Sequence, residues 1–361
     1  MESLVMQNIL SLFEGKRVLV TGDTGFKGSW LSLWLRELGA DVVGYALPPE
    51  RDDDLFNLLG LEQIIHHVEG DIRDLPAIQQ VFKWFQPEVL FHLAAQSLVR
   101  RSYSEPQRTF DTNVQGSVNV LEAVRTTRSL RVVVYVTTDK CYQNREWVWG
   151  YRENDELGGR DPYSASKAAA ELVFSAYSAS FFTHREGIGA ASVRAGNVLG
   201  GGDRALDRIV PDSLKALKNG EPVILRNPCA TRPWQHVLEP LSGYLLLAVK
   251  LYESPKDFSG AWNFGPTGES IRTVRDLTEK ILAYWGDGII RVETQTSGPY
   301  EADFLHLNCD KARRLLEWNP KWDFERTVAE TVRWYKCVDF GESALALTRE
   351  QILDYMVAKN D

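Results

Sequence analysis

The fold is decided by one stretch near the N-terminus, Arg17-Val18-Leu19-Val20-Thr21-Gly22-Asp23-Thr24-Gly25-Phe26-Lys27-Gly28. Its first five residues form a short apolar run typical of a buried strand, and large apolar residues then recur at helical spacing from Trp30 to Leu38. The glycines between strand and helix fit a turn that places a pyrophosphate on the helix N-terminus. We therefore expect a dinucleotide to be contacted by Gly22, Thr24, Gly25, Phe26, Lys27 and Gly28.

Strand-length apolar runs alternate with helix-length segments along the first half of the chain. The runs lie at 17–21, 41–45, 64–69, 89–93, 131–136 and 189–193. This alternation predicts an α/β fold with a Rossmann-type doubly wound parallel sheet. The pattern loosens later, so we expect a nucleotide-binding domain at 1–190 and a smaller substrate-binding lobe at 191–361. A strand near 260–265 is expected to return to the sheet.

Composition excludes several classes of protein. The chain has 361 residues, 44% of them hydrophobic, and a net charge of -8, which disfavours a nucleic-acid surface. The four cysteines are far apart and form no C-x-x-C pair, so neither a metal site nor a disulfide framework is expected. No segment approaches the roughly 20 apolar residues of a membrane span, and no signal peptide is recognised. These features predict a soluble, cytoplasmic protein.

Ligands of such sheets bind beyond the carboxyl ends of the strands. There we expect cofactor contacts from Asp71, Ile72, Leu93, Ala94 and Ala95, and substrate contacts from Gln96 and Ser97. The second strand lacks the acidic residue that usually binds the adenosine ribose, which weakens simple NAD recognition. Arg51 could face the 2′-phosphate of NADP, although three aspartates follow it. NAD is the favoured cofactor, and NADP stays open.

Tyr163 and Lys167 lie four residues apart in a helix-favouring segment, so they share one helix face. We expect the Lys167 ammonium and a positively charged nicotinamide to lower the pKa of the Tyr163 phenol toward neutrality. Tyr163 would then take a proton from a substrate hydroxyl while hydride leaves the same carbon.

Thr138, Asp139 and Lys140 follow the fifth strand. On an ideal strand, neighbouring side chains point to opposite faces, so Asp139 and Lys140 can serve one substrate only if the chain has already left the strand. A carboxylic acid beside a neutral amine would be an acid–base pair whose protonation states are coupled. The alternative is a solvated Asp-Lys turn.

Together these residues resemble the extended short-chain dehydrogenase/reductases and, within them, the nucleotide-sugar 4,6-dehydratases. The resemblance spans nearly the whole chain and includes Arg194–Asn197 and Asn263–Gly265. Most such dehydratases carry Thr-Asp-Glu where this chain has Thr138-Asp139-Lys140. That lysine, together with Gly25–Trp30, is similar to the dehydratases that act on CDP-glucose.

The resemblance implies that hydride passes from sugar C4 to NAD and back to C6. Tyr163 would take the proton of the C4 hydroxyl, which Thr138 would orient. Lys140 would remove the C5 proton, and Asp139 would protonate the leaving C6 hydroxyl. The product would feed deoxysugar synthesis for surface polysaccharide. The resemblance further implies substrate binding by Asn197, Arg208, Arg232 and Asn263. Tyr300 is a further candidate for substrate contact, and plain packing is its alternative role.

The resemblance also predicts a homodimer built on a four-helix bundle from helices at 105–125 and 163–185. Three alternatives remain. The enzyme could dehydrate dTDP-glucose or GDP-mannose, or it could be a 4-epimerase, which needs no acid and base at Asp139 and Lys140. A protein that senses the nucleotide without catalysis is the alternative from another class.

Overall fold

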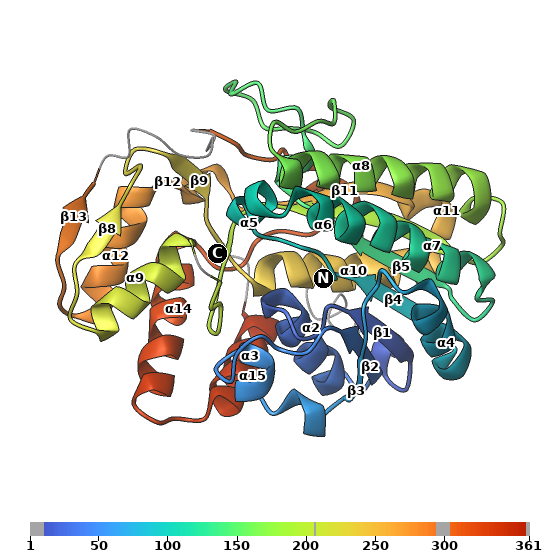
Figure 1. Ribbon diagram of the computed structural model, residues 1–361, viewed down its shortest axis with the longest axis horizontal. Coiled ribbons are helices and arrows are strands. Elements are labelled where there is room, and N and C mark those ends of the chain that lie inside the picture. The colour runs from blue at the N-terminus through green and yellow to red at the C-terminus, as the bar shows by residue number, and fades with distance from the viewer. Residues whose placement is uncertain (1–10, 206, 294–303, 359–361) are drawn as a thin grey trace.

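Seven parallel strands form the central sheet of the computed structural model, which describes residues 11–205, 207–293 and 304–358 (Figure 1). The strand order is β11-β6-β5-β4-β1-β2-β3, so the direction of winding reverses between β1 and β4. The strands are β1 (Arg17–Thr21), β2 (Asp41–Ala46), β3 (His66–Glu69), β4 (Val89–His92), β5 (Val132–Val136), β6 (Gly189–Ala195) and β11 (Gly260–Phe264). The predicted doubly wound α/β fold is confirmed.

The strands differ from the sequence-based ranges only at their ends. β3 begins two residues later than expected, and β6 continues to Ala195. The late strand forms at 260–264 and pairs in parallel with β6, with Asn263 opposite Arg194. A domain boundary at residue 190 therefore falls inside β6, and the second half of the chain contributes to the sheet.

Helices cover both faces of the sheet (Figure 1). One face is covered by α4 (Leu75–Phe85), α7 (Gly116–Thr126) and α8 (Pro162–Tyr177), and the other by α2 (Phe26–Glu37) and α10 (Leu238–Glu253). Alternate residues of β1 serve the two cores, with Leu19 on the first face and Val18 and Val20 on the second. Trp30 and Trp34 of α2 are fully buried. α15 (Ala344–Val357) packs outside α2.

The second lobe lies on the left of Figure 1, beyond the carboxyl end of the sheet. Its helices are α9 (Ile209–Lys218), α12 (Val274–Trp285) and α14 (Phe324–Asp339). Its strand pairs are β8 (Val223–Leu225) with β13 (Ile290–Val292), and β9 (Thr231–Pro233) with β12 (Ile271–Thr273). A third pair joins β7 (Val198–Leu199) to β10 (Gln235–His236).

Short helices complete the described chain: α3 (Leu55–Leu58), η1 (Leu61–Gln63), α5 (Val99–Ser104), α6 (Pro106–Phe110), η3 (Asp139–Cys141), α11 (Pro255–Phe258), η5 (Gly268–Ser270) and α13 (Asp310–Leu315). The two long helices expected for a dimer are interrupted. A π-helical turn, η2 (Asp111–Gln115), joins α6 to α7, and another, η4 (Ser178–Phe182), follows α8. No helix in the described ranges has the length and apolarity to cross a bilayer.

Candidate active site

The glycine-rich turn after β1 has the geometry that a dinucleotide requires. Gly22 has φ +81°, and a Cβ there would lie 2.7 Å from the amide nitrogen of Ala94. A Cβ on Gly28 would lie 1.9 Å from the Gly22 carbonyl oxygen, so only glycine lets helix α2 approach the turn this closely. Gly25 is exposed at the start of α2, whose unpaired N–H groups favour anions. The turn can therefore hold a pyrophosphate.

The other residues expected to contact the cofactor make different contacts within the protein. The Thr24 hydroxyl donates to the carbonyl of Leu47, at 2.9 Å, and ties the turn to the segment after β2. Asp71 pairs with Arg73 at 2.6 Å, and this contact lowers the pKa of the carboxyl group. Ile72 is buried against Gly116 and contributes packing. The half-buried residues 93–95 follow β4 beside Gly22.

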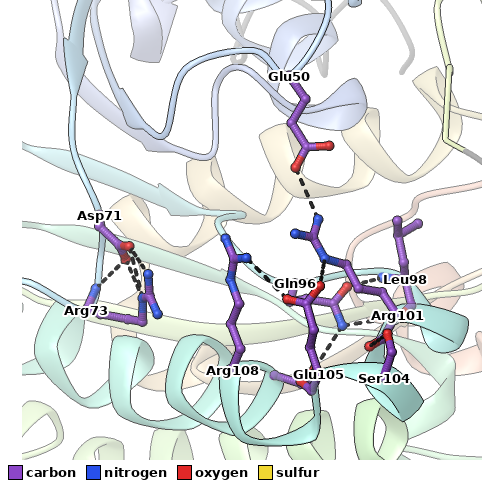
Figure 2. A network of polar contacts seen from close by, with 10 residues as sticks. Glu50, Asp71, Arg73, Gln96, Leu98, Arg101, Ser104, Glu105 and Arg108 are labelled. Atoms are coloured by element: carbon purple, nitrogen blue, oxygen red, sulfur yellow. Dashed lines mark hydrogen bonds and ion pairs between the residues drawn. The ribbon is translucent and has the colours of Figure 1, made fainter.

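Charged side chains join the segment after β2 to α5 and to Arg204. Figure 2 shows Glu50, in the segment after β2, pointing toward Arg101 of α5, with a 3.1 Å ion pair between them. Arg101 also pairs with Glu105 at 3.1 Å. Arg51 donates to Asp53 at 3.1 Å and to the carbonyl of Arg204 at 3.1 Å. Both contacts tie the Arg51 guanidinium to the protein itself.

Thr138, Asp139 and Lys140 lie in a turn that has left the sheet. β5 ends at Val136, and Asp139–Cys141 forms the 3₁₀ turn η3, with Thr138 as its N-cap. The Thr138 hydroxyl donates to Asp139 Oδ1 at 3.0 Å, and Lys140 Nζ lies 3.8 Å from the same oxygen. Asp139 is buried, whereas the Lys140 side chain is 33% exposed. The turn thus brings acid and amine together, which an extended strand would not.

Helix α8 presents Tyr163 and Lys167 to this turn. Asp161 caps the helix by accepting the amide N–H of Ser164 at 2.9 Å, and Pro162 occupies the first helical position. Burial raises the pKa of Tyr163 to about 12, against a hydrogen bond with Thr138. Burial also lowers the pKa of Lys167 to about 8, which weakens the cation that was expected to act on the phenol.

Lys27 joins the glycine-rich turn to the catalytic candidates. Its charge interacts with those of Arg208, Asp139, Lys167 and Lys140. Burial, with the nearby Arg208, lowers the pKa of Lys27 to about 8. The side chain therefore lies toward the reacting end of the site, and its role need not be confined to the cofactor.

The residues expected to bind substrate come from several segments of the chain. Arg208 pairs with Asp203 at 2.8 Å and acts electrostatically on Tyr163. Asn197 follows Gly196, where a Cβ would lie 3.0 Å from Asp139 Oδ2, so this segment passes beside the acid. Arg232 lies on β9 in the second lobe and donates to the carbonyl of Thr231 at 2.8 Å.

Gln96, Ser97 and Asn263 are placed differently from one another. The Gln96 amide donates to the Thr109 hydroxyl at 2.9 Å. It also donates to the carbonyl of Leu98 (Figure 2). Ser97 is exposed. Asn263 is fully buried, and its amide donates to the carbonyls of Tyr151 and Asn308. Asn263 therefore holds two segments together in this structure and does not face open space. Tyr300 lies outside the described residues.

A cavity of about 200 Å³ lies next to these segments. Its lining includes Gly150, Gly196, Pro233, Gly265, Leu307 and Arg313. Gly196 connects it to Asp139, because the same glycine passes against that carboxylate. The cavity is therefore adjacent to the candidate acid.

Sequence reasoning missed a buried ion pair behind the turn that carries Thr138, Asp139 and Lys140. Arg194 of β6 donates to both carboxylate oxygens of Glu171, at 2.9 and 2.8 Å. The Thr137 hydroxyl also donates to Glu171. Arg194 donates to the Tyr142 hydroxyl at 2.7 Å, which links the pair to the end of η3. The available signal was the spacing of Glu171 four residues after Lys167, on the same face of α8.

Comparison with known proteins places this geometry in a family. The family model described as GDP-mannose 4,6 dehydratase matches residues 19–331. The chain belongs to the GDP-mannose 4,6 dehydratase family. It is 49% identical to the CDP-glucose 4,6-dehydratase of Salmonella typhimurium (strain LT2), an alignment that covers 96% of this chain and 98% of that protein.

Solved structures agree with the family in fold. The dTDP-glucose 4,6-dehydratase of Streptomyces venezuelae, solved with NAD bound, is 26% identical with a TM-score of 0.74, over 89% of this chain and 97% of that one. An epimerase from Methanothermobacter thermautotrophicus gives a TM-score of 0.80 at 24% identity, over 96% of this chain and 98% of that one, and shows the fold alone.

Among the described residues of the present chain, no cluster of potential metal ligands occurs.

Proposed function

We propose that the chain converts CDP-glucose to CDP-4-keto-6-deoxyglucose, with NAD as its cofactor. The observation that carries the proposal is the turn after β5, where Thr138, Asp139 and Lys140 meet beside Tyr163. The 49% identity to the Salmonella CDP-glucose 4,6-dehydratase supports the choice of substrate. The product would then supply deoxysugar synthesis.

The residues around the glycine-rich turn fit NAD. Gly22 and Gly28 allow the close approach of turn and helix, and the start of α2 can receive the pyrophosphate. Arg51 is held by Asp53 and by the carbonyl of Arg204, which favours NAD over NADP. When bound, NAD would supply temporary storage of the hydride taken from C4 and returned to C6.

The side chains would divide the proton transfers among them. Tyr163 takes the proton of the C4 hydroxyl that Thr138 orients. Burial holds the pKa of this phenol high, and the nearby Arg208, together with the positive nicotinamide of bound NAD, would oppose that effect and favour the phenolate. Once C4 is a ketone, the C5 proton is acidic, and neutral Lys140 removes it. Asp139, in its acid form, donates a proton to the C6 hydroxyl, which leaves as water. Lys140 would give its proton back to C5 as the hydride returns to C6. An epimerase needs neither of these last two groups, so the pair favours dehydration.

The test is incubation of the protein and NAD with CDP-glucose, dTDP-glucose and GDP-mannose in parallel. We expect CDP-glucose to lose one water by mass spectrometry, and deuterium placed at C4 to reappear at C6 of the same product. Preferential turnover of dTDP-glucose or GDP-mannose would contradict the substrate. A C4 epimer without loss of water would contradict the reaction.

We also propose that two copies associate through α6–α7 and α8 in a four-helix bundle. These helices are neighbours on one face of the sheet (Figure 1). They carry exposed large apolar side chains at Phe110 (40% exposed) and Leu172 (60%), and Phe181 (44%) follows in η4. Burying such side chains favours association. Sedimentation should give a dimer, and a stable monomer at micromolar concentration would contradict it.

A further inference from the structure

The glycine-rich turn contains a buried carboxylate. Asp23, directly after Gly22, is 0% exposed, and its Oδ2 lies 2.7 Å from Nδ1 of His67 on β3. The other oxygen, Oδ1, is also buried and has no hydrogen-bond partner among the described residues. A buried carboxylate oxygen without a partner is costly, so the position of this group requires an explanation.

The sheet is shaped to admit this side chain. In the register of the sheet, Gly44 of β2 lies between Val20 of β1 and His67 of β3. A Cβ on Gly44 would lie 2.0 Å from Asp23 Oδ2, so any other residue would displace the carboxylate. β2 carries no acidic residue at its carboxyl end, and the turn instead brings its own carboxylate against that strand.

We propose that Asp23 and His67 form a charge-balancing pair that positions the glycine-rich turn and sets the affinity of the site for NAD. The inference rests on the NAD dependence proposed above. The protonated imidazole neutralises Asp23 within the turn that must receive a doubly charged pyrophosphate. If the imidazole loses its proton, an uncompensated anion remains beneath the cofactor's phosphates and repels them.

The surroundings of His67 support a cationic imidazole. Burial lowers the pKa of His67, but the hydrogen bond and charge of Asp23, with the charges of Glu62 on η1 and Glu69 on β3, outweigh burial and raise the pKa above its usual value. Phe56 of α3 packs against the ring, with centroids 5.0 Å apart. The imidazole side chain is 12% exposed, so protons can reach it.

Burial also raises the pKa of Asp23, against the opposing effect of His67. The two groups share one hydrogen bond, so the protonation of each depends on that of the other. The sign of the pH dependence follows from His67, whose pKa is raised. NAD affinity is fully developed at low pH and falls as pH rises through the titration of the imidazole.

The experiment measures the dissociation constant of NAD by calorimetry from about pH 6 to about pH 9, a range that brackets histidine titration. In the unmodified protein we expect the constant to rise with pH. His67→Gln keeps a donor for Asp23 but removes the charge, so NAD should bind about tenfold more weakly at low pH, with a flat profile. Adding Asp23→Asn removes the anion as well and should restore most of the affinity.

His66→Gln is the matched control. His66 neighbours His67 on β3, is exposed and packs against Trp84 on the outer surface, so its substitution should leave the profile unchanged. A flat pH profile in the unmodified protein, or a double variant no better than His67→Gln, would overturn the pair's electrostatic role. Absence of NAD binding by the unmodified protein at every pH would overturn the proposed function instead.

Discussion

Lys140 is the residue in which this chain departs from the Thr-Asp-Glu of most dehydratases that it resembles. Its Nζ lies 3.8 Å from Asp139 Oδ1, within reach of the same substrate. We expect Lys140→Met to lower the rate of dehydration by about 10²–10⁴-fold, the usual contribution of a general base. Hydride uptake from C4 should persist, because Tyr163 and Thr138 remain. Mass spectrometry measures dehydration, and the absorbance of reduced nicotinamide measures hydride uptake.

Lys83→Met is the control for this change, because Lys83 is an exposed lysine of α4 on a helix remote from the turn. Its variant should dehydrate the substrate at the normal rate. Unchanged turnover in Lys140→Met would remove Lys140 from the mechanism. Loss of both dehydration and hydride uptake would instead indicate that Lys140 serves substrate binding.

At the scale of residues, the sequence predicted that Asp139 and Lys140 lie close together after a strand, but it did not predict their surroundings. The position of Asp139 and Lys140 after a strand could be read directly, and η3 brings the two side chains together as that reading required. Contacts between distant segments could not be read. Asp23 and His67 are 44 positions apart, and the room for their contact depends on Gly44 in a third segment.

At the scale of elements, the ion pair between Glu171 and Arg194 joins α8 to β6 and so fixes the helix that carries Tyr163. Both side chains are buried. Removing one partner leaves a charge without compensation, which costs about 3–5 kcal/mol in buried pairs. We expect Glu171→Gln to lower the midpoint of thermal unfolding markedly. Replacing both residues, Glu171→Leu with Arg194→Met, should recover part of that loss.

A pair of similar geometry that is more exposed, 42% for Arg125 and 26% for Glu122, provides the comparison. Glu122 and Arg125 on α7 meet at 2.8 Å, the same separation as Arg194 Nη2 and Glu171 Oε2. Glu122→Gln should shift the midpoint only slightly, since water screens exposed charges. Equal shifts in Glu122→Gln and Glu171→Gln would show that burial of the inner pair does not govern its effect.

The elements themselves were largely predictable because the period of apolar residues differs between strands and helices. The ends of the strands and helices were less predictable. β6 extends to Ala195 because its residues 191–195 pair with all five residues of β11. No local sequence pattern contains that contact. The π-helical turns η2 and η4 interrupt helices that sequence periodicity describes as continuous.

At the scale of the whole molecule, an expected division at residue 190 separates α10 and α15 from the sheet and the helix against which they pack. α10 packs under β5 and β6, and α15 packs on α2 through Trp34 and Tyr355, whose ring centroids lie 5.8 Å apart. Long-range contacts of this kind depend on the complete fold. Only the strand near 260–265 gave a local signal for its return.

Glu239 couples these late segments, and its ionisation makes stability depend on pH. It lies fully buried at the start of α10, where it accepts the N–H groups of Lys321 and Trp322 and the hydroxyl of Tyr355. Burial outweighs these contacts and raises its pKa to about 7, from an ordinary 4.5. Its contribution to stability is therefore full below pH 4.5 and is lost as pH rises through 7.

Glu239→Gln cannot ionise, so its stability relative to the unmodified protein should increase with pH across that window. The full pKa shift corresponds to about 3 kcal/mol. Thermal unfolding of both proteins at several pH values measures the difference. Glu253→Gln, at the exposed end of the same helix, should show no such trend across the window. A difference for Glu239→Gln that stays constant with pH would mean that the carboxylate remains charged in the fold, held by its three donors.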